Sequence, residues 1–254
     1  MHLCLVTCSY DTDFEPVSKQ LTTKLAQIRQ EFEQFTLIVM NDASEHAAFA
    51  QAIREVNAPE VILYNVETKQ KGKWGMKGFA VREGLRIGLE LNADVYAYVN
   101  LNLKVDAKFI ASGMESMKKN GWEAAFGSRD PEDGGERIGA GSLGELKSSA
   151  FGKLARSLLP CLPKTRDTNG PLKLFSRNAA QLIVSRSQVN GAFFDCEWLI
   201  ITSENHIKHG FFPIIWKQRA GSRPPWRLVR SATSELLETR HRWKAGLYRK
   251  NSSG

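Results

Sequence analysis

The sequence has no run of about 18 apolar residues, so no segment of it is expected to span a membrane. Its first residues, MHLCLVTCSY, lack the charged region, apolar stretch and cleavage site of a signal peptide. It has only four cysteines, in apolar or loop settings and without the spacing of metal ligands, which favours reduced, buried thiols. These absences predict a cytoplasmic protein with a packed core.

The sequence has fewer acidic than basic residues. It contains 27 Asp and Glu and 35 Lys and Arg, which gives a formal net charge of +8. Such an excess predicts anionic partners. The basic residues gather at 69–77 and again at 219–250, with no nucleic-acid-binding motif beside them. Gly-x-Ser-x-Gly and Walker motifs are also absent, which argues against a hydrolase or a P-loop protein. A phosphate or a lipid headgroup is therefore the expected partner, and nucleic acid is not.

Short apolar runs alternate with amphipathic stretches along the first half of the chain. This alternation predicts an α/β fold with a mostly parallel, Rossmann-like central sheet flanked by helices. A second, less regular half follows, and the Gly-rich segment 131–144 is expected to be a mobile loop or a lid. The expected strands are 3–8, 35–40, 61–66, 95–99, 123–126, 168–175 and 213–216, and the expected helices are 15–35, 45–56, 79–91, 109–119, 146–159 and 197–207.

The stretch Asn92–Asp106 predicts the position of a ligand site. Its apolar run 95–99 stops at Asn100 and Asn102, two polar side chains that are two residues apart. In open α/β sheets, ligands bind beyond the carboxyl ends of the strands. We therefore expect this asparagine pair to face a ligand.

Several short motifs occur in an order that carries a family resemblance over residues 3–223. They are Cys8-Ser9-Tyr10-Asp11-Thr12, Asn41-Asp42-Ala43-Ser44, Met76-Lys77-Gly78, Gly127-Ser128-Arg129, the run Asp167–Arg177, Phe194-Asp195-Cys196-Glu197 and Gly221-Ser222-Arg223. In this order the chain resembles the family-2 GT-A glycosyltransferases. Within them it is most similar to the dolichyl- and polyprenyl-phosphate mannosyl and glucosyl transferases, with asparagines in place of the acids of the Asp-x-Asp element.

The resemblance implies a GT-A domain over residues 1–224 that moves a sugar from a UDP- or GDP-linked donor. The implied acceptor is a polyprenyl phosphate or another small acceptor. Residues implied to bind the nucleotide sugar are Thr7, Ser9, Tyr10, Asp42, Lys77, Asn100 and Asn102. Residues implied to bind the acceptor are Arg129, Lys147 and Lys173, and those implied in catalysis are Asp195, Glu197, Lys104 and Arg129.

Some of these residues also have a structural interpretation. Arg129 has acidic neighbours, Asp130 and Glu132, with which it can form a surface ion pair. Asp195 and Glu197 are acids at the expected start of a helix, where acids stabilise the helix end. Both interpretations stay open on the sequence alone.

The asparagine pair also bears on the cofactor. GT-A enzymes usually hold Mg²⁺ or Mn²⁺ with acidic side chains, because hard cations prefer anionic oxygen ligands. Asn100 and Asn102 offer only neutral carbonyl oxygens, and Lys104 follows them. We therefore expect no tightly bound cofactor, with Lys104, alone or together with Lys77 or Lys73, in place of the metal. The alternatives are weak Mg²⁺ or Mn²⁺ binding at the two asparagines, or a catalytically silent protein that binds a nucleotide sugar or a lipid phosphate.

Residues 225–254 form a tail in which apolar residues at near-helical spacing are interleaved with Arg and Lys. Such a basic amphipathic helix lies on an anionic membrane surface, or packs its apolar face on the domain or on a second subunit of a homodimer. The sequence alone does not decide between membrane contact and packing.

Overall fold

The computed structural model describes residues 1–10, 14–42, 46–66, 76–100, 105–139, 153–162, 167–217 and 226–249. Its strands are β1 (Leu3–Tyr10), β2 (Phe35–Asp42), β3 (Val61–Asn65), β4 (Val95–Val99), β5 (Ala124–Ser128), β6 (Glu136–Ile138), β7 (Leu172–Phe175), β8 (His209–Pro213) and β9 (Ile215–Lys217). Its helices are α1 (Phe14–Glu31), α2 (His46–Glu55), α3 (Lys77–Glu90), α4 (Lys108–Asn120), the 3-10 turn η1 (Pro131–Asp133), α6 (Arg177–Arg186), α7 (Phe194–Glu204) and α8 (Trp226–Lys244).

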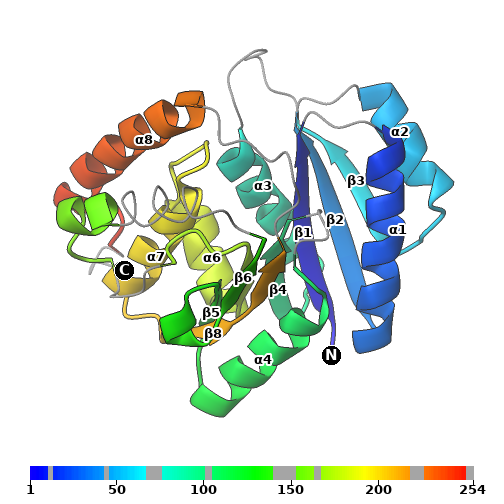
Figure 1. The fold of residues 1–254 in the computed structure, drawn as a ribbon, viewed down its shortest axis with the longest axis horizontal. Helices are drawn as coiled ribbons and strands as arrows, with labels where there is room; N and C mark the ends of the chain where they lie inside the picture. Colours follow the sequence, from blue (N-terminus) through cyan, green and yellow to red (C-terminus); the bar gives the residue numbers. More distant parts are fainter. Residues whose placement is uncertain are drawn as a thin grey trace.

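Seven strands form one sheet in the order β3-β2-β1-β4-β7-β5-β8. β1, β2, β3 and β4 run parallel, and β8 runs parallel to β5, while β7 is antiparallel to both of its neighbours, β4 and β5. A two-stranded sheet of β6 and β9 completes the fold. The prediction of a mostly parallel central sheet flanked by helices is confirmed (Figure 1).

Both faces of the sheet are covered. Alternate residues of β1 point to opposite faces, so Leu3 and Leu5 join the core on one side, and Cys4 and Val6 join the core on the other. One core is completed by α1, α2 and α4, and the other by α3, α6, α7 and α8. This burial on both faces explains why the strands read as continuous apolar runs.

Helix α3 approaches the sheet closely because two glycines face it. A Cβ built at Gly84 would lie 2.4 Å from Val6 Cγ1, and one built at Gly88 would lie 2.5 Å from Cys4 Sγ. The close packing brings the first residue of α3, Lys77, to the carboxyl edge of β1 and β4, where the site is expected.

Parts of the second half differ from the sequence prediction. Helix α6 was not predicted, and the strand expected at 213–216 is two strands, because β8 ends at Pro213 and β9 begins at Ile215. Segment 131–139 is structured as η1 and β6 rather than as a mobile loop, since β6 pairs with β9. Residues 140–152 lie outside the described residues.

Helix α8 contributes to the same core as α3, α6 and α7, and its colour in Figure 1 runs from orange to red. Leu236 of this helix and Tyr248 beyond it belong to the core on that face. Contact with a membrane surface and a domain boundary at residue 224 stay predictions. Within the described part of the chain, no helix has the length and apolar character needed to cross a bilayer.

Candidate active site

The carboxyl end of β4 carries a compact polar cluster. Asn100 Oδ1 accepts two hydrogen bonds, one from Tyr98 Oη at 2.7 Å and one from Lys77 Nζ at 3.1 Å. Lys77 reaches Asn100 because the first turn of α3 lies over the same sheet edge. The structure thus brings together two of the predicted nucleotide-sugar residues, Lys77 and Asn100.

A second lysine and a carboxylate join this cluster from β7 and α7. Lys173 is 1% exposed, and its ammonium forms an ion pair with Asp195 and donates to the backbone oxygen of Gly170. Its Nζ lies 5.3 Å from the centre of the Tyr98 ring and 5.5 Å from that of Phe194. Lys77 Nζ lies over the same two rings, at 5.5 and 5.7 Å. The two ammonium groups therefore lie over the same two aromatic rings.

The charges in this cluster do not balance. Burial lowers the pKa of Lys173, although the Asp195 carboxylate opposes the shift. Burial also disfavours the charged form of Lys77, but Tyr98 and Asp195 outweigh it, so the pKa of Lys77 lies above its ordinary value. Two lysines with one carboxylate leave an excess of one positive charge, which suits an anionic ligand.

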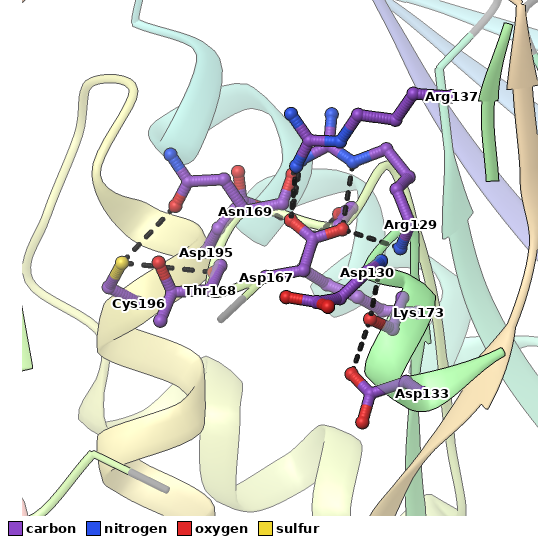
Figure 2. Close-up of polar contacts among 12 residues, drawn as sticks. Arg129, Asp130, Asp133, Arg137, Asp167, Thr168, Asn169, Lys173, Asp195 and Cys196 are labelled. Carbon is purple, nitrogen blue, oxygen red and sulfur yellow. Dashed lines mark hydrogen bonds and ion pairs between the residues drawn. The ribbon is translucent and has the colours of Figure 1, made fainter. Parts of the chain in front are cut away.

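Beside this cluster, Arg129 forms a buried ion pair with Asp167 (Figure 2). Arg129 donates from its backbone N and its Nε to Asp167 Oδ2 at 2.7 and 2.8 Å, and from Nη2 to Oδ1 at 2.6 Å. Nη2 also donates to the backbone oxygen of Asn169, and Arg137 Nη2 lies 3.8 Å from Asp167 Oδ1. The ion pair that the sequence left open exists, but its acid is Asp167 rather than Asp130 or Glu132.

The contacts of this ion pair shift both pKa values. Burial raises the pKa of Asp167, but hydrogen bonds from Arg129 outweigh it and hold that pKa below its ordinary value. Burial likewise disfavours the Arg129 guanidinium, and the bonds to Asp167 hold the pKa of Arg129 above its ordinary value. Among the described residues, Arg129 Nη1 has no hydrogen-bond partner, so it is the nitrogen that remains for a ligand.

Glu197 is placed differently from Asp195, although both lie in the first turn of α7. Glu197 is fully buried, and its carboxylate accepts from the backbone N of Gln188 at 2.8 Å, the backbone N of Val189 at 3.0 Å and Tyr248 Oη at 2.9 Å. Burial raises its pKa, while these hydrogen bonds act in the opposite direction. Neither acid caps α7 by a side-chain hydrogen bond. Glu197 binds the backbone of the loop before α7, whereas Asp195 forms an ion pair with Lys173.

The other predicted residues fall into two groups. Thr7, Ser9 and Tyr10 lie on β1 and Asp42 on β2, where Tyr10 pairs with Asp42 in the strand register, so all four are near the carboxyl ends of adjacent strands. Lys104, Asn102 and Lys147 lie outside the described residues.

Sequence reasoning assigned no role to several residues that build the site. The rings of Tyr98 and Phe194 lie beside the lysines, and Asp167 forms ion pairs with both Arg129 and Arg137. Asp167 and Phe194 begin two of the motifs named above, so their place in those motifs was an available signal. For Tyr98, alternation along β4 was the signal, because it places Tyr98 and Asn100 on the same face.

The described residues do not supply a donor set that fits a divalent cation. They contain no group of three or more His, Cys, Asp or Glu side chains placed to hold a metal ion. The carbonyl oxygen of Asn100 already accepts from an ammonium and a hydroxyl group.

Comparison with solved structures identifies the fold. Glucosyl-3-phosphoglycerate synthase from Mycobacterium tuberculosis, in complex with Mn²⁺, UDP and glucosyl-3-phosphoglycerate, matches with a TM-score of 0.66 at 13% identity over 98% of this chain and 81% of that chain. Mannosyltransferase PcManGT from Pyrobaculum calidifontis, in complex with GDP-Man and Mn²⁺, matches with a TM-score of 0.60 at 12% identity over 96% of this chain and 64% of that chain. No family model and no curated protein sequence matches the chain. The fold is thus the GT-A fold, and identities this low show the fold alone.

The comparison also corrects the cofactor prediction. We expected no tightly bound cofactor, with lysines in place of a metal. This expectation is wrong, because Mn²⁺ accompanies UDP-glucose in the mycobacterial synthase and GDP-Man in the archaeal enzyme.

Proposed function

We propose that this chain is a glycosyltransferase that moves a sugar from a UDP- or GDP-linked donor to a phosphorylated acceptor. The observation that carries the proposal is the pair of lysines, Lys77 and Lys173, that lies over the same two aromatic rings at the carboxyl edge of the sheet, with Asp195 paired to Lys173. The GT-A fold supports it, because ligands of open α/β sheets bind at this edge. The two similar enzymes bind UDP-glucose and GDP-Man, so both donors belong to the proposal.

In this proposal Lys77 contacts the leaving group. Cleavage of the sugar–phosphate bond builds negative charge on the nucleoside diphosphate, and pre-aimed cations stabilise such charge in the transition state. Lys77, at the start of α3 and over the Tyr98 ring, is assigned a contact with the diphosphate that adds to the charge of a divalent cation and does not replace it. The N-terminus of α3 adds donors and a positive helix end for the same anion.

Arg129 and Asp195 are assigned to the acceptor. Arg129 presents Nη1 to the acceptor phosphate, while Asp167 holds the other side of the guanidinium. A phosphate acceptor is already ionised near neutral pH, so it needs no base. A hydroxyl acceptor needs one, and Asp195 is the carboxylate beside the lysines that is placed to take its proton. Glu197 has no catalytic role in this proposal, because its carboxylate binds the loop before α7 and Tyr248.

The proposal includes two kinds of acceptor. The resemblance implies a polyprenyl phosphate, whereas the mycobacterial synthase binds phosphoglyceric acid with UDP-glucose. Both present a phosphate, so Arg129 is assigned the same role with either. A silent binding protein remains the rival, since it would keep the nucleotide-sugar contacts without turnover.

The test is a transfer assay with Mn²⁺ present, since both similar enzymes contain it. UDP-glucose and GDP-mannose are each offered with 3-phosphoglycerate and with a polyprenyl phosphate, and the products are identified by mass spectrometry. Lys77→Met should lower kcat about 100- to 1000-fold, the range for loss of one preorganised donor. Lys108→Met is the matched control, because Lys108 is exposed at the start of α4. Stabilisation by a nucleotide sugar without any product would favour the silent binding protein.

A further inference from the structure

The segment between α6 and α7, residues 187–193, leads directly into Phe194 and Asp195 of the site. Three helices hold it. From α3, Phe79 N donates to Asn190 O at 3.1 Å, and Arg82 donates to Ser187 O at 3.1 Å and to Asn190 Oδ1 at 3.0 Å. From α7, the Glu197 carboxylate accepts from backbone nitrogens of the segment. The third contact comes from α8.

That contact is made by Glu235, whose Oε2 accepts from the backbone N of Phe193 at 2.9 Å. Phe193 is the N-cap residue of α7, and no side chain of its own caps this helix. The first backbone N–H groups of a helix lack partners within the helix, and a carboxylate at this end also favours the positive helix terminus. Glu235 thus supplies from α8 the cap that α7 lacks.

A neighbouring glycine is adapted to the same contact. A Cβ built at Gly191 would lie 1.8 Å from Glu235 Oε1. The Glu235 side chain therefore occupies the space that a side chain at position 191 would need, so any residue larger than glycine there would displace it. The carboxylate therefore lies directly against the backbone of Gly191 as well as that of Phe193.

The residues next to this cap are those of the site. Phe194 has its ring 5.7 Å from Lys77 Nζ and 5.5 Å from Lys173 Nζ, and Asp195 pairs with Lys173. A rotation of the first turn of α7 would move both the ring and the carboxylate. Displacements of about 1 Å in catalytic geometry are enough to lower rates about 100-fold.

We propose that Glu235 is a positioning residue for the transfer reaction: from α8, it fixes the first turn of α7 and thereby sets Phe194 and Asp195 against Lys77 and Lys173. This inference rests on the proposed function. It gives the C-terminal helix a part in the reaction, although none of its described residues belongs to the cluster of lysines.

The experiment compares Glu235→Ala and Glu235→Gln in the full chain, with Glu238→Ala as the matched control. Glu238 lies on the same helix, and its side chain is 59% exposed and pairs with Arg242. Glu235→Ala should lower kcat at least about tenfold, with KM for the donor changed less than about twofold. Glu235→Gln keeps an oxygen that accepts from Phe193 N and should restore most of kcat. A fall in thermal stability with kcat unchanged would show a structural role only and overturn the inference.

Two further measurements complete the test. Gly191→Ala should reproduce the loss of kcat by displacing Glu235, and it should add little in the Glu235→Ala background, because the two changes act through one contact. Hydrogen exchange of the peptide spanning 190–199 needs no activity and should quicken in Glu235→Ala. An inactive wild-type chain overturns the proposed function and the catalytic part of this inference with it. Exchange that is unchanged in Glu235→Ala overturns the inference alone.

Discussion

The ion pair of Arg129 and Asp167 gives the sharpest test of the structure. Its side chains are only 13% and 2% exposed, and Arg129 makes two side-chain hydrogen bonds to the carboxylate besides the one from its backbone N. Arg129→Met removes the side-chain bonds and takes the nearest cation away from a buried carboxylate. Breaking a buried pair in this way costs about 3–5 kcal/mol. That is a large part of the roughly 5–15 kcal/mol by which proteins are stable.

The assay is urea unfolding at pH 7, with the free energy of unfolding obtained by linear extrapolation. Arg137→Met is the matched control, since Arg137 Nη2 lies 3.8 Å from Asp167 Oδ1 and its side chain is 21% exposed. This control should cost less than Arg129→Met, because at 3.8 Å its nitrogen lies beyond hydrogen-bond distance of the carboxylate. The double variant Arg129→Met with Asp167→Asn should be more stable than Arg129→Met alone, because it no longer buries a carboxylate that has lost its two side-chain hydrogen bonds from Arg129.

The same pair predicts a dependence on pH. The pKa of Asp167 is held below its ordinary value in the folded protein, so its contribution to stability is present above the unfolded pKa of about 3.9 and is lost as the pH falls through the folded pKa. The difference between the wild type and Arg129→Met should therefore shrink below about pH 4. An equal difference at pH 3 and pH 7, or a cost no greater than that of Arg137→Met, would refute the reasoning.

Three further predictions concern other parts of the chain. Gly84→Ala should destabilise the protein by about 1–3 kcal/mol in urea unfolding, because the new methyl group would lie 2.4 Å from Val6 Cγ1; a gain of stability, as expected for Ala in an exposed helix, would contradict the packing of α3. Cys4 and Cys196 are buried, and burial raises the pKa of each to about 12, so mass spectrometry should find neither alkylated at pH 8 before the protein unfolds. Binding of the tail to an anionic membrane stays a prediction, and it requires that Lys244→Glu, an exposed change on α8, weaken flotation with phosphatidylserine vesicles at low salt.

The sheet was largely predictable because its central strands are buried on both faces. Continuous apolar runs marked β1 to β4, and the apolar spacing of three and four marked α1 and α3. Helix α6 escaped because its buried residues are Ala179, Ala180 and Ile183, and two alanines give a weak apolar period. Strand β6 escaped for another reason: it has three residues, and its partner β9 lies far along the chain.

The direction of β7 was not predictable either. Alternation along Leu172–Phe175 says which residues share a face but not which way the strand runs. Its antiparallel insertion between β4 and β5 places Lys173 beside Tyr98 in the register. The second lysine of the site therefore depends on a strand pairing that a single sequence does not display.

The partner of Arg129 shows how nearby residues can mislead. Asp130 and Glu132 are the close acids in sequence, yet Asp130 accepts from Glu132 N to begin η1, and Asp133 accepts from Ser128 Oγ at 2.5 Å. Asp130 and Asp133 thus serve the turn that follows β5. Asp167 is distant in sequence, but it leads into β7, which pairs with β5, so the sheet itself brings this carboxylate to Arg129. The sequence predicted that Arg129 could form an ion pair with an acidic residue. Only the strand order shows that this residue is Asp167. The same reasoning applies to Lys77, whose bond to Asn100 joins residues that meet only where α3 crosses the end of β4.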